Sequence, residues 1–558
     1  MAALAECIRN YFQTKITGSY RLIFNFESSH ICYTIDMKIE PGHFVVIVLL
    51  VVFGVFVAYS SKNNYGVSAP AVQQAPLPAV VEKDTPDVTL QNGDTYDLAA
   101  GYVANMVGGK MQTMLAYNGS IPGPTIHVMQ GSEITINFKN NTDLPALLHS
   151  HGVRMDNAYD GSQLVQDELK PGESFSYKLK FPDAGIYWYH PHAKEVYGQG
   201  LGLYGAFVVT PKDPKYFPLV NREVPLFLSD VPMTNGVITL RKDVADFSLM
   251  GHYGNVMLIN GKDAYTLDAK EGETVRLYVI NAANVRPFNF AIEGVKLKLV
   301  GSDSGAYEKE TFVDSVILAP SERAIVDVLM PKAGVYSISN KTPVGTYALG
   351  TVSVSGEQTK DSYKDEYGTL ENSEVTTKSI AKFQNVIDSE PTKRISLSID
   401  MKGNMMGMGH SGGGMMGGGM MSGVSPDGIE WNDGHQQMNM MSSTDSITWK
   451  IVDIDTGKEN MDVDWVFKKD VPVKIRIFND PNSMHPMQHP IHFHGQRFLV
   501  VDRNGVKQTN LAWKDTVLVR SGETVDIVLD PSNPGTWMAH CHISEHLEAG
   551  MMIPFTVK

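Results

Sequence analysis

Histidines in this chain recur in pairs whose members are separated by one residue. Placing 17 histidines at random in 558 residues would give about 0.5 such pairs, yet four occur. They are His149/His151, His190/His192, His492/His494 and His540/His542. Side chains alternate between the two faces of a β-strand, so both imidazoles of a pair point to one face. A single pair is usually part of a sandwich core, but four pairs indicate shared metal sites.

A second kind of metal centre is predicted around Cys541, which stands between the two histidines of the last pair. On a strand, its thiolate faces away from those two imidazoles. His546 and Met551 follow it at five and ten residues, and His489 precedes the third histidine pair. Two imidazoles, a thiolate and a weak thioether are the ligands of a blue-copper electron-transfer site. Zinc also accepts Cys and His but rarely uses thioether sulfur, and a buried structural cysteine is the other alternative.

The elements that position these residues are short alternating apolar runs, broken by Gly, Pro, Asn and Asp from about Asp87 onward. This pattern is typical of β-sandwiches, and no long segment with helical periodicity competes with it. Three blocks recur in the same order, which indicates three copies of one sandwich. The first block occupies 131–140, 272–281 and 470–479; the second occupies 169–181, 318–330 and 519–530; the third begins at Pro182, Pro331 and Pro534. We expect domains at 86–212, 218–356 and 392–558.

The histidine pairs hold equivalent positions in the first and third copies of this repeat. The middle copy replaces them by other residues, which are Ala291, Glu293, Ser339 and Lys341. The first and third copies therefore carry four paired histidines each, and the middle copy carries none. Two half-sites that face each other across a domain interface would bind a metal cluster through eight imidazoles.

These residues resemble those of the three-domain multicopper oxidases, which include laccases, ascorbate oxidase and bacterial cuprous oxidases. The resemblance covers roughly 90–558 and rests on the motifs HSHG, YWYHPH, HPIHFHG and HCHISEHLEAGMM. It implies an all-β chain of three cupredoxin-like Greek-key sandwich domains. It also implies a cofactor of four coppers, namely one type 1 copper, one type 2 copper and a type 3 pair.

The resemblance assigns a ligand set to each copper. The type 1 ligands would be His489, Cys541, His546 and Met551. The type 2 ligands would be His149 and His492. The type 3 ligands would be His151, His190, His192, His494, His540 and His542. Ser150 stands where many members have Trp, which affects packing behind the ligands and not ligation.

The implied reaction is one-electron oxidation of a substrate at the type 1 copper, coupled to four-electron reduction of O₂ to water. The electron would cross Cys541 to the neighbouring histidines. Asp160 matches the family's acidic residue near the type 2 copper, so we expect a proton donor there; a turn residue in Tyr-Asp-Gly is the alternative. Glu545 and Glu548 lie close to the type 1 ligands, but Leu547 stands where some cuprous oxidases have a Glu. The chain departs from that proton route.

Methionine is concentrated in a segment of the third copy, 401–441, which contains eleven of the 28 methionines, twelve glycines, His410 and His435. Gly-rich sequence does not pack a core, so we expect the segment to be mobile. Thioether sulfur is a soft ligand for Cu(I). The position of this segment in the third copy resembles that of a similar segment in bacterial cuprous oxidases. The alternative is a flexible loop with adaptable apolar side chains. A Cu(I) path toward His489 would continue over Met484, His485 and Met487.

The partners predicted are therefore O₂ and a reducing substrate, either Cu(I) or phenols and aromatic amines as in laccases. The Met-rich segment would hinder bulky aromatic substrates, and Fe(II) and Mn(II) also remain open. A copper nitrite reductase fits less well, because that family usually has two domains per chain. A non-enzymatic copper-storage protein would leave the histidine cluster unexplained, and a copper-free scaffold would not need the intact ligands.

The N-terminal region contains an uncharged apolar run of sixteen residues, Phe44–Tyr59, whereas a spanning helix needs roughly 20. Its flanks can extend it, so we expect a membrane anchor or signal helix at 44–60 and a linker at 61–85. A buried core helix is the alternative. Residues 1–43 would be an extra tail or a misassigned start. The folded body would then be extracytoplasmic, in the periplasm or at the cell surface.

Composition excludes several other classes of protein. Hydrophobic residues make up 43% and charged residues 19%, which rules out a wholly disordered chain. A net charge of −14 argues against nucleic acid as a partner, since phosphate binding needs clustered Lys and Arg. The three cysteines are Cys7, Cys32 and Cys541, and only the last lies in the folded body, so that body has no internal disulfide.

Overall fold

A hairpin and a large body of β-sheets make up the parts of the chain that the computed structural model describes, residues 20–28, 31–39, 78–402 and 426–558. The chain divides into two compact units, Met1–Gln73 and Gln74–Lys558. In the first unit, β1 (Tyr20–Ser28) pairs antiparallel with β2 (Ile31–Ile39). This hairpin lies within the tail expected at 1–43, where the sequence pattern predicts no element.

The expected membrane anchor at 44–60 lies outside the described residues, as does most of the expected linker. Within the described ranges, no helix has the length and apolar character that crossing a membrane requires. The end of the linker is described and joins the body: Val81 bridges to Ala104, and Lys83 bridges to Ser120.

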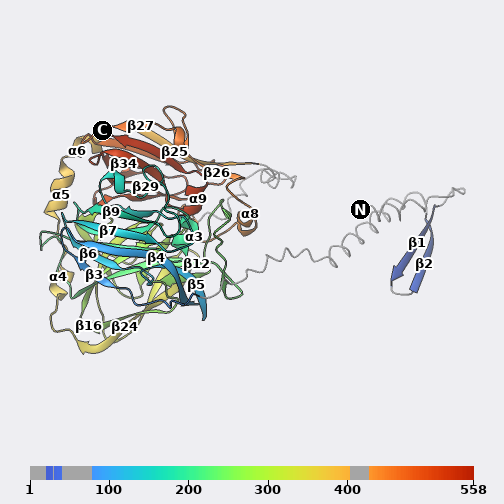
Figure 1. The fold of residues 1–558 in the computed structure, drawn as a ribbon, viewed down its shortest axis with the longest axis horizontal. Helices are drawn as coiled ribbons and strands as arrows, with labels where there is room; N and C mark the ends of the chain where they lie inside the picture. Colours follow the sequence, from blue (N-terminus) through green and yellow to red (C-terminus); the bar gives the residue numbers. More distant parts are fainter. Residues whose placement is uncertain (1–19, 29–30, 40–77, 403–425) are drawn as a thin grey trace. The chain divides into compact units, whose positions relative to one another are not determined.

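Residues 87–210 form the first pair of sheets, drawn in blue to teal (Figure 1). The five-stranded sheet runs in the order β3 (Asp87–Leu90), β6 (Thr125–Met129), β11 (Gly205–Thr210), β10 (Gly185–Pro191) and β8 (Leu148–His151). The four-stranded sheet runs in the order β5 (Lys110–Tyr117), β4 (Thr95–Val107), β7 (Glu133–Asn140) and β9 (Ser174–Lys180).

Residues 222–358 form the second pair of sheets, with a short ribbon of β13 (Met233–Thr234) and β14 (Val237–Ile238). The six-stranded sheet has the order β15 (Val256–Ile259), β12 (Arg222–Val231), β17 (Thr274–Asn281), β22 (Arg323–Leu329), β19 (Leu297–Ser302) and β20 (Gly305–Val313). The five-stranded sheet has the order β16 (Tyr265–Glu271), β24 (Gly345–Gln358), β23 (Gly334–Thr342), β18 (Phe288–Ile292) and β21 (Val316–Leu318).

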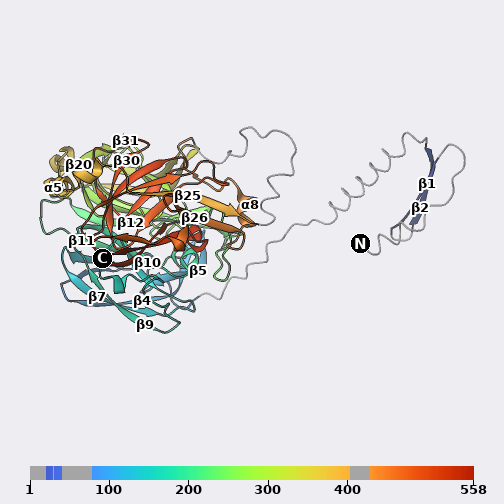
Figure 2. The ribbon, with the colours of Figure 1, turned by 90° about the horizontal axis from the view of Figure 1, so that it is seen from above.

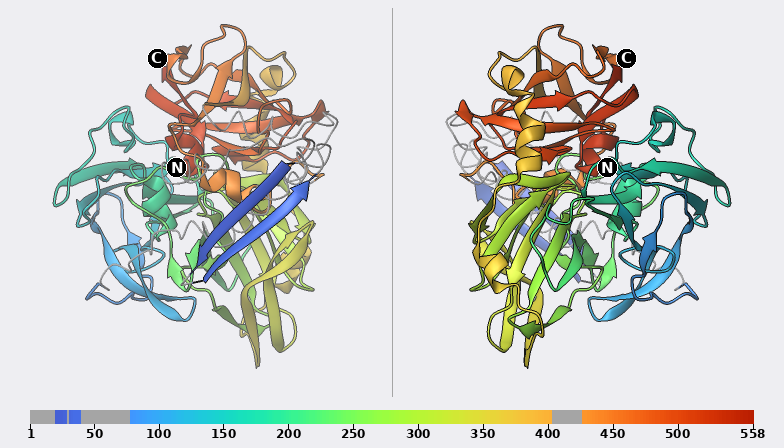
Figure 3. Two further views of the ribbon diagram at one scale, coloured as in Figure 1. Left: turned by 90° about the vertical axis from the view of Figure 1, so that its right-hand side faces the viewer. Right: turned by 90° about the vertical axis from the view of Figure 1, so that its left-hand side faces the viewer.

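Residues 393–557 form the third pair of sheets, whose orange and red strands meet both other groups (Figure 3). The larger sheet has the order β26 (Ile447–Asp453), β25 (Lys393–Met401), β28 (Val473–Asn479), β34 (Thr524–Asp530), β30 (Arg497–Arg503) and β31 (Val506–Lys507), with β32 (Trp513–Lys514) on β30. The smaller has the order β27 (Trp465–Phe467), β36 (Met552–Val557), β35 (Gly535–Cys541), β29 (His489–Phe493) and β33 (Thr516–Val519).

Short helices lie between and beside the strands. Three of them fill the stretch between the second and third pairs of sheets, where the sequence pattern predicts no element: α4 (Lys364–Gly368), α5 (Glu374–Ala381) and α6 (Gln384–Ile387). The others are α3 (Glu195–Gly200), α8 (Gln436–Met440) and α9 (Ser544–Glu548), with 3₁₀ turns η1 (Asn157–Tyr159) and η2 (Asn460–Asp462). The predicted all-β class is confirmed.

The first repeat block forms an equivalent strand in each pair of sheets: β7, β17 and β28. In β7 the buried residues alternate with more exposed ones, because successive side chains point to opposite faces. The equivalent strand β17 is buried throughout, since it lies inside a six-stranded sheet between β12 and β22. Local pattern therefore predicts these strands, while their burial depends on the neighbours.

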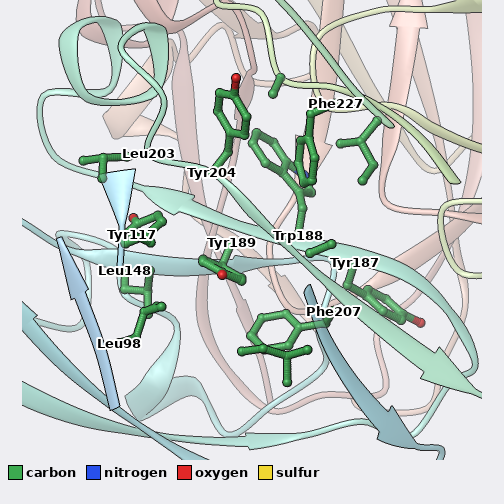
Figure 4. Packing of buried hydrophobic residues seen from close by; sticks show 14 of the residues in the cluster. Leu98, Tyr117, Leu148, Tyr187, Trp188, Tyr189, Leu203, Tyr204, Phe207 and Phe227 are labelled. Atoms are coloured by element: carbon green, nitrogen blue, oxygen red, sulfur yellow. The ribbon is translucent and has the colours of Figure 1, made fainter. Parts of the chain in front are cut away.

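The apolar core of the first pair of sheets extends into the second. One cluster contains Trp188 and Tyr204 of the first pair together with Phe227 and Tyr278 of the second. Figure 4 shows part of this cluster, in which the rings of Tyr204 and Phe227 stack with centroids 5.0 Å apart. Burial of such large rings contributes strongly to stability, so the two pairs of sheets form one packed body. That body fixes the strands that carry the histidines.

Candidate metal centres

The paired histidines lie on strands whose register brings them face to face. In the first pair of sheets, β8 and β10 are antiparallel, and His149 is opposite His190. In the third, β29 and β35 are antiparallel, and His492 is opposite His540. Residues directly opposite each other project from the same face of a sheet. Each ladder therefore presents a compact block of imidazoles, and the second member of each pair follows two residues later.

The eight paired histidines converge in one cluster, and each is at most 2% exposed. Three groups of three have their ligand nitrogens within 4.8 Å of one another. The groups are His149, His151 and His492; His151, His190 and His542; and His192, His494 and His540. The structure thus brings histidines of the first and third pairs of sheets together, and His151 belongs to two of the three groups.

Most of these imidazoles are oriented by a hydrogen bond at Nδ1. Carbonyl oxygens face the Nδ1 atoms of four of them: Asp160 O for His149 (2.7 Å), Pro191 O for His190 (2.9 Å), Asp515 O for His492 (2.8 Å) and Cys541 O for His540 (2.9 Å). Side-chain oxygens of Gln163 (3.0 Å) and Asp160 (3.0 Å) face those of His192 and His494. Such bonds fix the tautomer, so that Nε2 is free to bind a metal.

The free nitrogens show that a metal ion fits this cluster. The Nε2 atoms of His149, His190, His192 and His492 and both ring nitrogens of His542 are buried without a hydrogen-bond partner among the described residues. Leaving that many buried polar atoms unsatisfied is costly, and a bound cation would satisfy them. Imidazole is a ligand that copper favours.

The cluster favours neutral imidazole, which is the ligating form. Burial, followed by the neighbouring imidazoles, lowers the pKa of His190, His492 and His540 well below the usual range. Burial likewise lowers the pKa of His542 to about 3. The lone pairs of these rings are therefore available to a cation at neutral pH.

Asp160 lies at the end of η1, beside histidines from both halves of the cluster. Its carboxylate accepts hydrogen bonds from His494 Nδ1 at 3.0 and 3.1 Å, and its carbonyl accepts one from His149 Nδ1. Burial acts to raise the pKa of Asp160, but the two imidazoles outweigh it and hold the pKa well below the usual range. The residue orients both rings, and its role as a proton donor stays a prediction.

The second centre forms around Cys541, which is opposite Ile491 in the ladder and points into the core of the third pair of sheets. Its Sγ lies 3.6 Å from His489 Nδ1 and 3.7 Å from His546 Nδ1, and these two nitrogens are 3.3 Å apart. Met551 belongs to the same core, and its carbonyl accepts a hydrogen bond from the Cys541 amide at 3.1 Å. His489, Cys541 and His546 therefore meet at one place, and the backbone of Met551 is held beside Cys541.

Trp449 on β26 covers this second centre. Its ring stacks on His546 with centroids 4.1 Å apart and meets His489 edge-on at 4.9 Å. The indole Nε1 donates to the carbonyl of Ser248 at 2.8 Å, which holds the ring in place. Burial raises the pKa of the Cys541 thiol, so the thiol is protonated in the metal-free chain.

The end of the Met-rich segment packs onto the body beside this centre, which differs from the expected mobile segment over all of 401–441. Ile429 and Trp431 are buried, and Figures 1 and 2 show α8 beside β26. Residues 403–425 lie outside the described residues. The ring of His435, in the described part, meets the ring of His485 with centroids 5.2 Å apart. His485 in turn meets Trp449 at 6.4 Å.

Glu430 completes this group, and we call Glu430, His435 and His485 the outer cluster. Glu430 Oε1 lies 3.9 Å from His485 Nε2. Burial, with a smaller contribution from the nearby Asp433 charge, raises the pKa of Glu430 to about 8. Burial lowers the pKa of His485 to about 3. The sequence pattern singles out His485, but it gives no reason to select Glu430 beyond its place between two apolar residues.

Glu545 and Glu548, whose directions sequence reasoning leaves open, lie on α9. Glu545 is buried and accepts hydrogen bonds from the backbone and the Nδ1 of His252, at 2.8 and 2.7 Å. Part of the Glu548 side chain is exposed, but the protein around its carboxyl group, followed by the Glu545 charge, raises its pKa to about 7. The sequence pattern does not identify His252 as a partner, because the two segments are far apart in the chain.

Three family models, each described as multicopper oxidase, match the chain at residues 100–214, 232–358 and 433–558. The multicopper oxidase mco of Staphylococcus aureus is 24% identical over 455 residues, which cover 80% of this chain and 84% of that protein. Copper resistance protein A of Pseudomonas syringae pv. tomato is 26% identical over 326 residues, 50% of this chain and 52% of that protein.

A solved structure of the multicopper oxidase from Campylobacter jejuni, described as a metallo-oxidase, is also similar. It is 25% identical, has a TM-score of 0.63, and the match covers 87% of this chain and 99% of that one. The matched regions cover parts of all three pairs of sheets and include every histidine of the two centres.

Proposed function

This chain belongs to the multicopper oxidase family, and we propose that its reducing substrate is Cu(I). It has the family's cupredoxin-like fold, and it is an oxidoreductase that uses copper and O₂. When bound, the four coppers of this family accept single electrons from a substrate and supply four electrons that reduce O₂ to water. The residues of the chain hold these ions, shield them from solvent and select the substrate.

We propose the following ligands for the four coppers. The type 1 ligands are His489, Cys541, His546 and Met551. The type 2 ligands are His149 and His492. The type 3 ligands are His151, His190 and His542 for one ion and His192, His494 and His540 for the other. The convergence of these nitrogens within 4.8 Å in each group of three supports the division.

The observation that carries Cu(I) as the substrate is the outer cluster beside the type 1 residues. His485 Nε2 and both carboxylate oxygens of Glu430 are buried and have no hydrogen-bond partner within the described parts of the chain. His485 Nε2 and Glu430 Oε1 are 3.9 Å apart. Since metal–ligand bonds to nitrogen and oxygen are about 2 Å long, a metal ion fits between these two atoms.

The imidazoles of the outer cluster and the thioethers around it suit a soft cation, and the Glu430 carboxylate adds a negative charge. Imidazole and thioether both bind Cu(I) well. Met440 on α8 is 61% exposed, and Met441 and Met484 are 54% and 52% exposed. These thioethers belong to the segments that carry His435 and His485, so they can collect Cu(I) from solvent. The methionines of 403–425 would add to this capacity.

Burial of the type 1 residues favours a small substrate over an aromatic one. His489 is 1% exposed and Trp449 is fully buried. A phenol therefore has no open edge of His489 to contact, whereas a metal ion held by His485 would be separated from His489 by the ring of Trp449. The relative described as a copper resistance protein and the one described as a metallo-oxidase support the same substrate class.

Substitution of His485 by leucine tests this proposal. The variant should lower kcat/KM for Cu(I) at least about tenfold, as loss of a metal-positioning group does. Its blue absorption should match the parent, because the type 1 ligands are untouched. His127→Leu, on β6 and paired with Asp87, is the control and should leave Cu(I) turnover unchanged. Cu(I) turnover in His485→Leu equal to the parent would contradict the proposal.

We also propose that the enzyme works outside the cytoplasm, held at the membrane by the apolar run at 44–60. The uncharged apolar run supports a membrane anchor. Cys541 must bind copper outside the reducing cytosol, which supports a location outside the cytoplasm. An oxidase there would convert Cu(I) to Cu(II) before the ion enters the cell, which is a direct contribution to copper tolerance.

A further inference from the structure

The middle pair of sheets carries no predicted copper ligand, yet one of its arginines reaches the histidine cluster. Arg323, at the start of β22, forms a double hydrogen bond with Asp515: Nη1 to Oδ1 at 2.5 Å and Nη2 to Oδ2 at 2.6 Å. Asp515 Oδ1 lies 3.0 Å from His151 Nε2. All three side chains are fully buried. The three residues come from the second, third and first pairs of sheets respectively.

The arginine also binds the strand that carries the next histidine pair. Arg323 Nε donates to the carbonyl of Ile186 on β10 at 3.1 Å. The approach of these groups requires glycine at position 152, directly after His151. A Cβ there would lie 2.2 Å from Asp515 Oδ2 and 2.9 Å from Arg323 Nη2, and the backbone has φ +80°. The contact between Arg323 and Asp515 therefore depends on the backbone of the first pair of sheets, at Gly152 and at Ile186.

A strained serine beside this arginine points to the same histidine. Ser321 is fully buried and has φ +78°, a left-handed conformation that costs energy for a residue other than glycine. Its hydroxyl lies 3.0 Å from Nε2 and 3.2 Å from Nδ1 of His151. Glycine would adopt this conformation without strain, so the contact of the Ser321 hydroxyl with His151 is what serine adds at this position.

His151 is oriented differently from the six histidines whose Nδ1 atoms are hydrogen-bonded. Its Nε2 faces the Asp515 carboxylate and the Thr516 hydroxyl, at 3.0 and 3.1 Å. Donation from Nε2 to the carboxylate would make Nδ1, which lies 3.2 Å from the Ser321 hydroxyl, the nitrogen that binds a metal. The direction of the Nδ1 lone pair depends on where the carboxylate sits, and the planar fork of Arg323 fixes both oxygens of the carboxylate.

We propose that Arg323 and Ser321 are positioning residues for the type 3 copper pair, acting through His151. The middle pair of sheets then has a role in the metal cluster without supplying a ligand to it. This inference rests on the assignment of His151 as a ligand in the proposed function, and it is independent of Cu(I) as the substrate.

Two variants of the copper-loaded protein test the inference. Arg323→Lys keeps the positive charge but loses the two-pronged contact with Asp515. Ser321→Gly removes the hydroxyl and relieves the strain, so it should unfold at the same temperature as the parent or higher. The control is Asp327→Asn, four residues along β22. Asp327 forms an equivalent buried double contact with Arg276, at 2.8 and 2.8 Å, away from the histidines.

The readouts are copper per chain, the near-ultraviolet absorption of the type 3 pair, the blue absorption of the type 1 site and the unfolding temperature. Arg323→Lys and Ser321→Gly should weaken copper retention at the type 3 pair by about 10-fold or more and should reduce its absorption. Their blue absorption should stay equal to the parent. Asp327→Asn should unfold at a lower temperature but keep all of its copper signals.

Full type 3 absorption and full copper content in both variants would overturn the inference. A loss of blue and type 3 signals together in Arg323→Lys, with Ser321→Gly unaffected, would also overturn it, because the arginine would then act on folding alone. If the parent itself lacks a type 3 signal when loaded with copper, the ligand assignment of the proposed function fails instead.

Discussion

Replacement of Glu430 by glutamine removes an ionisable group from the outer cluster while keeping the size of the side chain. Both carboxylate oxygens of Glu430 are buried and unpaired within the described residues. Such a carboxylate is unfavourable for folding and is useful for holding a cation. The substitution should therefore raise the free energy of unfolding and lower kcat/KM for Cu(I).

The stability effect follows from the raised pKa. Folding raises the pKa of Glu430 from 4.5 to about 8, so the folded state holds the proton more tightly than the unfolded state. Stability from this group is fully present below pH 4.5 and is lost as the pH rises through about 8. At 1.36 kcal/mol per unit, the loss reaches about 5 kcal/mol. Glu430→Gln should equal the parent at low pH and exceed it by about 3 to 5 kcal/mol at pH 9.

The effect on Cu(I) follows from Coulomb's law. An ion held between Glu430 Oε1 and His485 Nε2 would lie about 2 Å from the carboxylate oxygen, and even at twice that distance, about 4 Å, a unit charge gains about 4 kcal/mol at an effective dielectric constant of about 20. Removing the Glu430 proton at pH 7 costs about 1 kcal/mol, since its pKa is about one unit higher. The balance of about 3 kcal/mol corresponds to roughly a 100-fold lower kcat/KM for Cu(I) in Glu430→Gln.

The assays are denaturant unfolding from pH 4.5 to 9 and O₂ uptake with Cu(I) at pH 7. Asp453→Asn is the control, because Asp453 is a buried carboxylate of the same pair of sheets whose contacts include Trp465 Nε1 at 3.0 Å. Burial acts to raise the pKa of Asp453, but its hydrogen bonds outweigh this and lower it, so Asp453→Asn should lose stability at neutral pH and keep its Cu(I) turnover. A Glu430→Gln variant with unchanged Cu(I) kcat/KM would refute the placement of the substrate, whatever its stability.

Three further predictions concern the whole enzyme. Cys541→Ser should abolish the blue colour and O₂ reduction together, because the thiolate is the type 1 ligand; a blue variant would disprove that assignment. Replacing residues 403–425 by a short Gly/Ser linker should lower kcat/KM for Cu(I) while the blue absorption stays unchanged and phenol oxidation stays level or rises; equal Cu(I) turnover would support a plain flexible loop. Protease added to intact spheroplasts that contain the full chain should remove the folded body, and full protection of that body would place it in the cytosol.

The histidine cluster could be predicted from the sequence because its geometry depends on local rules. Alternation along β8, β10, β29 and β35 fixes which side chains share a face, and the threefold repeat places the pairs at equivalent sites. The same alternation predicts that the Cys541 side chain points away from His540 and His542. These inferences need no knowledge of how distant segments pack.

The contacts that support the cluster could not be predicted in the same way. Arg323 meets Asp515 across 192 residues, and Glu545 meets His252 across 293 residues. Such pairings depend on how the sheets dock, which a single sequence does not reveal through periodicity. Trp449 is another example, since its strand pattern predicts a buried residue but not the histidines on which it stacks.

The described part of the Met-rich segment shows a limit of reasoning from composition. Abundant glycine predicts a mobile loop throughout 401–441, but Ile429 and Trp431 supply enough apolar surface for the later part to pack. That packing is what places His435 and Glu430 beside His485. Composition averages over a segment, whereas two large side chains decide where part of it docks.

Oxygen consumption by the fully copper-loaded protein, measured at steady state with Cu(I), Fe(II) and a phenol in turn, tests the central claim most directly. The outer cluster and the buried type 1 residues predict the highest kcat/KM with Cu(I), lower turnover with Fe(II) and poor turnover with the phenol. His485→Leu should reduce only the Cu(I) rate. A phenol oxidised faster than Cu(I), with no effect of His485→Leu on any rate, would contradict the account and indicate a laccase.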